Sequence, residues 1–158
     1  MELSVLMEAQ RAYYRTGATR SLAFRELMLD SLYRKIREME PEINAALRAD
    51  LGKSAFESYM CETGLTLSEI SYMKTHLRDF AAKKRVRTPI AQFPSRSYVL
   101  KEPYGCVLIM SPWNYPFMLT LEPLADAIAA GNTAILKPSA YSPATSSVIK
   151  KLIATVFP

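Results

Sequence analysis

Residues 105–117 read GCVLIMSPWNYPF, and residues 118–139 continue as MLTLEPLADAIAAGNTAILKPS. The run Cys106–Met110 is apolar throughout, which is typical of a strand that is covered on both faces in a parallel sheet. Pro112 and Pro116 fix φ and donate no backbone hydrogen bond, so the chain must leave the sheet after this strand. We therefore predict a buried strand followed by a polar turn.

A helix and a second strand follow the turn. Apolar residues recur every three or four positions between 117 and 130, which predicts a helix, with Gly131 as its left-handed end and Pro123 as the site of a kink or restart. Thr133–Leu136 is a second apolar run. Because βαβ crossovers are right-handed and make both strands parallel, both strands end at one rim, where open α/β sheets bind ligands.

Two polar residues stand at this rim. Asn114 offers a neutral amide donor and Lys137 offers a cation. Each also has an ordinary structural interpretation, because an asparagine can stabilise a turn through its own backbone and a lysine at a strand end is commonly just solvated. The sequence has no GxGxxG motif, so the usual dinucleotide fingerprint is absent. The residues alone leave open whether this half binds a nucleotide.

Four blocks resemble consecutive signature blocks of the aldehyde dehydrogenase superfamily, in order and at the expected spacing: EPYG at 102–105, PWNYPF at 112–117, AAGN at 129–132 and LKPS at 136–139. RSLAFR at 20–25, ALRADLGK at 46–53 and Glu57 resemble its shorter-chain branch, which includes the class 3 and fatty aldehyde enzymes. The resemblance covers essentially the whole chain. It implies an α/β fold in which an N-terminal helical layer lies on a partial Rossmann-like parallel sheet.

The resemblance also assigns roles to residues. Asn114 matches the asparagine whose amide helps to hold the oxyanion formed when a cysteine thiolate attacks the aldehyde. Lys137 matches the lysine that binds the adenosine ribose, and Met110, Ser111, Pro112 and Trp113 match the wall along the dinucleotide. The implied cofactor is NAD or NADP. The implied reaction is oxidation of an aldehyde to a carboxylate through a cysteine thiohemiacetal and a thioester.

Two departures from the family pattern matter. The family often follows Lys-Pro-Ser with a glutamate that accepts from the ribose 2′-hydroxyl, but this sequence has Ala140, which makes NADP plausible. The family's nucleophilic cysteine and general-base glutamate are expected beyond position 158. We interpret Cys61 and Cys106 as core thiols and expect the chain to be inactive alone. The rival interpretation is a non-catalytic remnant that acts as an interaction or regulatory module.

The N-terminal half is predicted to be helical. Apolar periodicity indicates helices at 3–15, at 21–39 with Ser21 as cap, at 41–52 between Pro41 and Gly52, and from Ala55 onward after a capping box at 54–57. The last helix has a predicted apolar stripe of Phe56, Met60, Thr63, Leu67, Ile70, Met73, Leu77 and Phe80. A strand is expected at 95–102 and a final helix at 143–157. These elements divide the chain into a helical layer (1–88), a crossing strand of an oligomerisation arm (89–104) and a β-α-β-α unit (105–158).

Composition limits the remaining classes. The chain has 158 residues, 49% of them hydrophobic, a formal net charge of +5 and two cysteines, which is typical of one globular domain without a disulfide framework. No signal peptide or membrane-length apolar run is visible, so we expect a cytoplasmic protein.

The cluster KKR at 83–85 with Arg87 is interpreted as a solvated helix C-terminus, with a nucleic-acid or membrane patch as the alternative. Aromatic residues do not interleave with it, so no nucleic-acid partner is expected. By resemblance, the partner is a second copy in a dimer.

Overall fold

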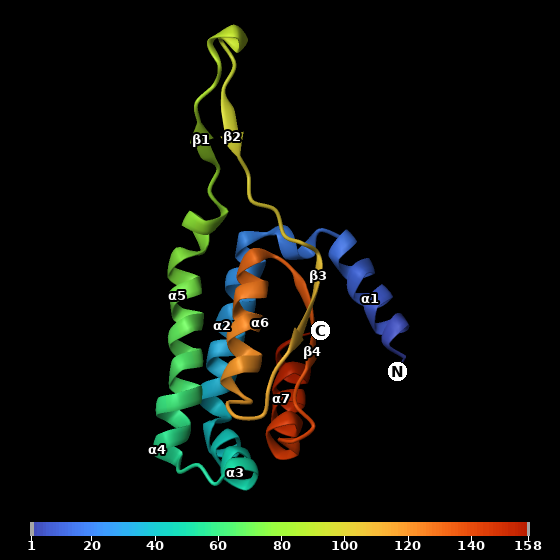
Figure 1. The fold of residues 1–158 in the computed structure, drawn as a ribbon, viewed down its shortest axis with the longest axis vertical. Coiled ribbons are helices and arrows are strands. Elements are labelled where there is room, and N and C mark those ends of the chain that lie inside the picture. Colours follow the sequence, from blue (N-terminus) through green and yellow to red (C-terminus); the bar gives the residue numbers. More distant parts are fainter. Residues whose placement is uncertain (1, 158) are drawn as a thin grey trace.

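The chain passes from a layer of helices through a protruding hairpin into a β-α-β-α unit (Figure 1). The computed structural model describes residues 2–157. The elements are α1 (Leu3–Arg15), η1 (Ala18–Arg20), α2 (Leu22–Glu38), α3 (Glu40–Leu51), α4 (Ala55–Ser58), η2 (Tyr59–Thr63), α5 (Gly64–Ala81), β1 (Lys84–Val86), η3 (Ile90–Gln92), β2 (Ser97–Val99), β3 (Cys106–Met110), α6 (Met118–Ala130), β4 (Thr133–Lys137) and α7 (Pro143–Val156). This arrangement confirms the predicted fold class.

The first three helices begin and end where their caps predict. The Ser21 hydroxyl accepts a hydrogen bond from the N–H of Phe24 at the start of α2. Pro41 lies in the first turn of α3, and Gly52 ends that helix with a left-handed φ of 70°. Helix α1 has the predicted bounds, but none of its residues is buried, so its apolar side does not enter the core of the described chain.

The predicted long helix is interrupted by a π-helical turn, η2, between α4 and α5. The predicted stripe is therefore wrong at its first two positions, since Phe56 is 77% exposed and Met60 is 53% exposed. A π-turn contains more residues than an α-turn, so a period of 3.6 extended backward across it reaches the wrong face. The buried side chains of α4 and η2 are Ser58 and Glu62, together with Thr63 of the predicted stripe.

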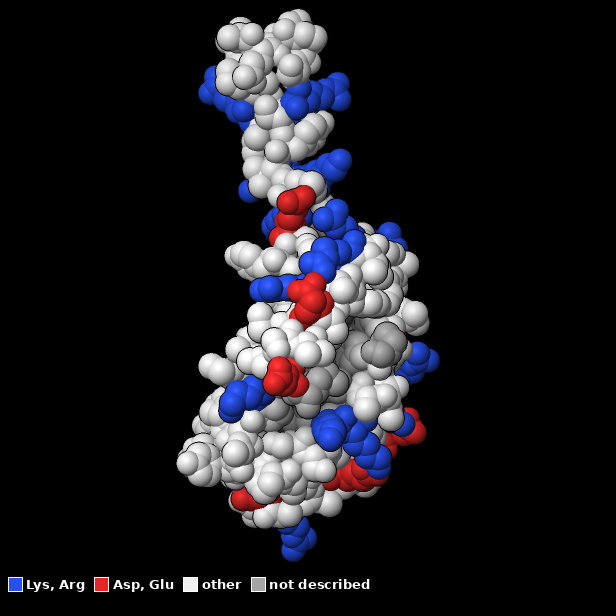
Figure 2. Space-filling view, turned by 90° about the vertical axis from the view of Figure 1, so that its right-hand side faces the viewer, with Lys and Arg blue, Asp and Glu red and all other residues white. Residues whose placement is uncertain are grey.

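Strands β1 and β2 pair antiparallel, with Arg85 opposite Tyr98, and form an arm that projects beyond the helices (Figure 1). The prediction that the basic cluster at 83–85 ends a helix is wrong, because α5 stops at Ala81 and these residues enter the arm. Six basic residues and no acidic residue lie between 83 and 101. Figure 2 shows basic side chains along the arm below a tip without charge.

The hairpin begins before residue 89, because β1 at Lys84–Val86 is one of its two strands. The predicted division of the chain at residue 89 stays a prediction.

Strands β3 and β4 are parallel and adjacent, as predicted, and are connected by α6. Helix α6 runs through Pro123, so the predicted restart there is wrong. Leu108 and Met110 of β3 are 58% and 68% exposed. The expected cover on both faces of β3 is therefore not supplied by residues 2–157.

The core lies where α6 packs against α5, β4 and α2, and where α7 packs against α3.

A buried arginine, Arg25, connects the start of α2 to the end of α6. Arg25 donates hydrogen bonds to the carbonyls of Thr19, Arg20 and Ala129, and burial lowers the pKa of its guanidinium. The guanidinium lies against Gly131, whose φ of 89° ends α6. The C-terminal turn of α6 is thus tied to the start of α2.

Candidate functional site

The carboxyl ends of β3 and β4 lie side by side, as the sequence predicts. Met110 stands opposite Lys137 in the parallel register. One position further along, the N–H of Ser111 donates to the carbonyl of Lys137 at 3.3 Å. The turn that carries Asn114 and the strand end that carries Lys137 therefore begin at the same rim of the sheet.

The turn between β3 and α6 is closed at its base by hydroxyl groups. The Thr120 hydroxyl donates to the carbonyl of Pro116 at 2.6 Å, and Ser111 Oγ lies 2.5 Å from Thr120 Oγ1. Thr120 has one hydroxyl hydrogen, which this bond to Pro116 uses, so the Ser111 hydroxyl donates to Thr120. The first and last residues of the turn are in this way joined through one side chain.

Asn114 is exposed in this turn. Its carboxamide makes no hydrogen bond with any residue in the described part of the chain, so both amide hydrogens are free to donate outward. Its backbone carbonyl, in contrast, accepts a hydrogen bond from Lys53 Nζ at 3.2 Å. The arrangement joins a fixed backbone to a free neutral donor, which is what stabilisation of a developing oxyanion requires.

A buried ion pair lies beneath the turn. Lys53 Nζ is 2.5 Å from Glu62 Oε1, and the two side chains are 8% and 0% exposed. The other carboxylate oxygen of Glu62 accepts from the N–H groups of Phe117 and Met118 at 2.8 and 3.2 Å. Lys53 Nζ also lies 4.1 Å from the centre of the Tyr115 ring. The pair therefore contacts the residues on both sides of Pro116, the last proline of the turn.

The side chains that resemble a dinucleotide wall differ in their exposure. Met110 and Trp113 are 68% and 54% exposed, and Pro112 is exposed, whereas Ser111 is buried beneath them. The Lys137 ammonium is exposed and makes no hydrogen bond or ion pair with residues 2–157. An unpaired cation beside exposed apolar surface fits a ligand that offers hydroxyl oxygens and flat rings.

The residue after Lys-Pro-Ser, Ala140, has no side-chain acceptor. Ala140 is exposed in a turn, and the neighbouring Ser139 hydroxyl accepts from the N–H of Tyr141. No carboxylate stands at this position, so nothing there repels a phosphate.

Neither cysteine lies on the turn that carries Asn114 or on the strand end that carries Lys137. Cys61 is half-buried in η2, and Cys106 is half-buried at the amino end of β3, the opposite end from Asn114. No group of three His, Cys, Asp or Glu side chains in the described chain could hold a metal ion. Across residues 2–157, every helix is too short or too polar to cross a membrane.

Acidic residues on α5 and α6 lie close together. Burial, followed by the charge of Glu69, raises the pKa of Asp126 from 3.8 to about 6. Burial also raises the pKa of Glu122, with further contributions from Glu69 and Asp126. At neutral pH the negative charges of these carboxyl groups repel one another and destabilise the packing of α5 against α6.

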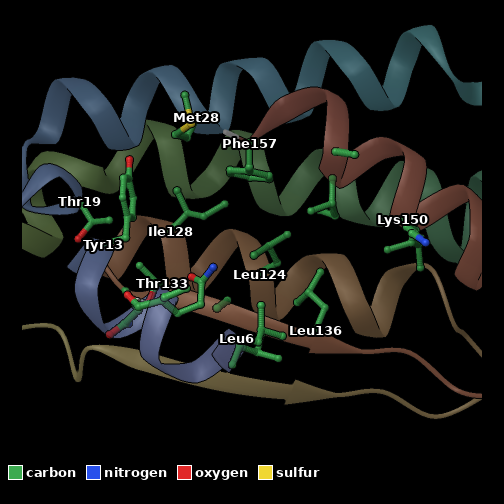
Figure 3. Close-up of a pocket in the computed structure, with 18 of the residues that line it drawn as sticks. Leu6, Tyr13, Thr19, Met28, Leu124, Ile128, Thr133, Leu136, Lys150 and Phe157 are labelled. Atoms are coloured by element: carbon green, nitrogen blue, oxygen red, sulfur yellow. Dashed lines mark hydrogen bonds between the residues drawn. The ribbon is translucent and has the colours of Figure 1, made fainter. Parts of the chain in front are cut away.

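A cavity of about 880 Å³ lies between α1, α2, α6, β4 and α7. Figure 3 shows Leu6, Met28, Leu124 and Phe157 directed into it from different elements. Its walls are mainly apolar, and neither Asn114 nor Lys137 belongs to them. The cavity thus adjoins the strand end that carries Lys137, through Leu136 and Pro138, but does not include the two polar side chains of the rim.

Sequence reasoning missed the pair beneath the turn. Lys53 was noted only as the end of the block at 46–53, and Glu62 was not singled out. No signal in the sequence marks Glu62 as buried, because glutamate is common on exposed helix faces. Helical periodicity could not show that Glu62 faces inward, since that direction depends on the π-turn.

Comparison with known proteins agrees with this geometry. Residues 3–158 match the aldehyde dehydrogenase family. The chain is 46% identical over 147 residues to the 4,4'-diaponeurosporen-aldehyde dehydrogenase of Staphylococcus aureus, covering 93% of the chain and 32% of the relative. It is 42% identical over 153 residues to mouse aldehyde dehydrogenase family 3 member A2, covering 97% of the chain and 31% of the relative.

Solved structures give the same fold. A substrate-bound Staphylococcus aureus AldH aligns over 99% of this chain and 34% of its own, with a TM-score of 0.95 and 44% identity. A Streptococcus pyogenes succinic semialdehyde dehydrogenase in complex with NADP⁺ aligns over 98% of this chain and 33% of its own, with a TM-score of 0.85 and 21% identity.

The chain thus spans about a third of the length of the relatives that it matches. The predicted resemblance to the class 3 branch is confirmed by the identity to family 3 member A2. Two of the solved structures that share this fold, the Streptococcus pyogenes enzyme and a Methanocaldococcus jannaschii glyceraldehyde-3-phosphate dehydrogenase, are complexes with NADP. This chain belongs to the aldehyde dehydrogenase family.

Proposed function

We propose that this chain supplies the oxyanion donor and one wall of the dinucleotide site of an NAD(P)-dependent aldehyde dehydrogenase. The observation that carries the proposal is the free carboxamide of Asn114, presented on a fixed backbone at the rim formed by β3 and β4. Ligands of open α/β sheets bind outside the carboxyl ends of the strands, where this amide stands.

The proposed role of Asn114 is electrostatic. When a thiolate adds to an aldehyde, negative charge develops on the carbonyl oxygen, and a neutral donor stabilises that charge without first binding a competing anion. Cys106 lies at the opposite end of β3 from Asn114, and Cys61 lies in η2 beneath the turn, so we propose neither as the nucleophile. The nucleophile is therefore proposed to come from outside the described residues.

The proposed role of Lys137 is to bind the cofactor. Its free ammonium would donate to ribose hydroxyl groups, and the exposed Met110 and Trp113 would pack along the dinucleotide. The bound dinucleotide supplies hydride acceptance, which no side chain can provide. Without an acidic residue at Ala140, we propose that NAD and NADP are both used.

The arm is proposed to contact a second copy of the chain. Ile90 and Phe93 at its tip are 89% and 85% exposed, and such side chains are normally covered by a partner. This supports a dimer as the working assembly. An interaction module without catalysis would need the same arm but would have no use for the free amide of Asn114.

The proposal is tested by a hybrid enzyme, in which residues 1–158 replace the matching third of the Staphylococcus aureus 4,4'-diaponeurosporen-aldehyde dehydrogenase. We expect the hybrid to form NADH or NADPH with a panel of aliphatic and aromatic aldehydes. The 158-residue chain alone serves as the control and is expected to give no turnover. A folded hybrid without turnover, measured beside an active parent enzyme, would favour the interaction module.

A further inference from the structure

We propose that Lys53 and Glu62 are positioning residues that hold the backbone from which the Asn114 amide projects. This inference rests on the proposed role of Asn114. It concerns two side chains that contact neither an aldehyde nor a dinucleotide in that role, since both are buried beneath the turn. Their influence would act through the turn alone.

Lys53 contacts the part of the turn that precedes Pro116. Its ammonium has three hydrogens, and three acceptors surround it: the Glu62 carboxylate at 2.5 Å, the Asn114 carbonyl at 3.2 Å and the face of the Tyr115 ring at 4.1 Å. The ammonium is therefore fully engaged although its side chain is only 8% exposed. Of these contacts, the bond to Asn114 acts directly on the proposed catalytic residue.

Glu62 contacts the backbone that follows Pro116. Its Oε2 accepts from the N–H groups of Phe117 and Met118, which lie at the start of α6 and have no acceptor within that helix. A carboxylate at this end also complements the helix dipole. Glu62 thus fixes where α6 begins, four residues after Asn114.

The π-turn η2 brings Glu62 into this position. Residues Tyr59–Thr63 form the π-helical turn, and Glu62 is fully buried within it. π-turns of this kind occur often at functional sites, because they redirect one side chain without ending the helix. Here the redirected side chain is the one that contacts both Lys53 and α6.

Positioning matters because oxyanion stabilisation depends on geometry. A displacement of about 1 Å at a reacting centre costs roughly 10²-fold in rate. Asn114 receives no hydrogen bond to its side chain from the described residues, so its backbone is the part of it that the fold controls. Loss of the pair should consequently lower turnover more than it changes substrate or cofactor binding.

Two variants of the hybrid enzyme test this. Lys53→Met with Glu62→Gln removes both charges together but keeps an acceptor for the start of α6, which avoids leaving one buried charge unpaired. Lys53→Arg keeps the charge, but a planar guanidinium cannot serve Glu62 and the Asn114 carbonyl in the geometry of an ammonium. The matched control is Lys151→Met with Glu42→Gln, which removes an exposed ion pair between α7 and α3.

We expect both test variants to lower kcat by about tenfold or more, with KM for the aldehyde and Kd for NADP within about threefold. The control should leave all three values unchanged. Thermal melting shows which variants are folded, and hydrogen exchange of residues 113–119 should be faster in both test variants. If either folded variant keeps kcat within about twofold of the parent hybrid, the positioning role is wrong.

Hydrogen exchange separates this inference from the proposed function. If the parent hybrid is inactive, the proposed function fails, yet exchange still reports whether the pair holds the turn. Unchanged exchange of residues 113–119 in the double variant would then overturn the positioning role as well. Faster exchange would support it independently of turnover.

Discussion

The ammonium of Lys53 donates a hydrogen bond to the backbone carbonyl of Asn114, across 61 positions of sequence. This bond ties the loop before α4 to the turn after β3, and thus ties the helical layer to the sheet rim. The helical layer is accordingly part of the proposed site rather than only its support. Substitutions around Lys53 can affect a donor that stands on a different element.

Lys137→Ala in the hybrid enzyme should weaken cofactor binding. A hydrogen bond from a charged donor contributes about 1.5–3 kcal/mol, so Kd for NAD or NADP should rise by about tenfold to hundredfold while kcat at saturation is preserved. Isothermal calorimetry gives Kd directly. Lys150→Ala, which removes an exposed lysine of α7, is the control. Equal Kd values for all three proteins would make Lys137 an ordinary surface residue.

Ala140 predicts comparable use of the two cofactors. No acceptor for the ribose 2′-hydroxyl is provided at this position, and nothing there repels a 2′-phosphate. The ratio of kcat/KM for NAD and NADP should therefore lie below about a hundredfold, or about 2.7 kcal/mol. Ala140→Glu should shift the ratio toward NAD. A strong NAD preference in the unmodified hybrid would require an acceptor elsewhere.

Gly131→Ala should destabilise the hybrid more than Gly52→Ala. Both glycines end helices with positive φ, at 89° and 70°. A Cβ at Gly131 would collide with the Arg25 guanidinium, whereas a Cβ at Gly52 would meet no atom within 4 Å. We expect about 1 kcal/mol of backbone strain at Gly52 and at least ~2 kcal/mol in total at Gly131. Denaturant unfolding measures the difference, and equal losses would show that Arg25 adjusts freely.

Asp126→Asn should stabilise the hybrid at pH 7.5. The pKa of Asp126 is raised to about 6 in the folded state, so its stabilising contribution is present below pH ~4 and is lost as pH rises through 6. Since the side chain is only partly withdrawn from solvent, screening reduces the expected gain to ~1 kcal/mol. Melting temperatures between pH 4 and 8 should converge at low pH. Asp79→Asn is the control, and a variant that parallels the parent at every pH would contradict this pKa shift.

Much of the fold could be predicted from local sequence. Caps such as Ser21 and Gly52 act through neighbouring backbone groups, so their effects are visible in sequence, and the two strands are recognisable as short apolar runs between turn signals. The two strands also predict the rim, because a right-handed crossover makes β3 and β4 parallel and places their carboxyl ends at the same edge of the sheet.

The errors arise where structure depends on distant contacts. Phe56 and Met60 are exposed because a π-turn changes the 3.6-residue period of the helix. No residue type in this segment marks a π-turn in the sequence. The basic cluster at 83–85 was assigned to a helix end, but its backbone pairs with residues more than ten positions away in β2. Lys53 and Glu62 came together only through tertiary structure.

The central claim is that the amide of Asn114 stabilises negative charge in the reaction. Steady-state kinetics of Asn114→Ala in the hybrid enzyme tests it most directly, with cofactor Kd measured in parallel. Loss of one such donor costs about 3–4 kcal/mol, so kcat should fall by about 10²- to 10³-fold while Kd for NAD or NADP stays within about twofold. Asn114→Asp, which keeps the shape but cannot donate when ionised, should be impaired at least as much. A fall in kcat of less than about threefold for Asn114→Ala, or a comparable loss of cofactor affinity, would contradict the account.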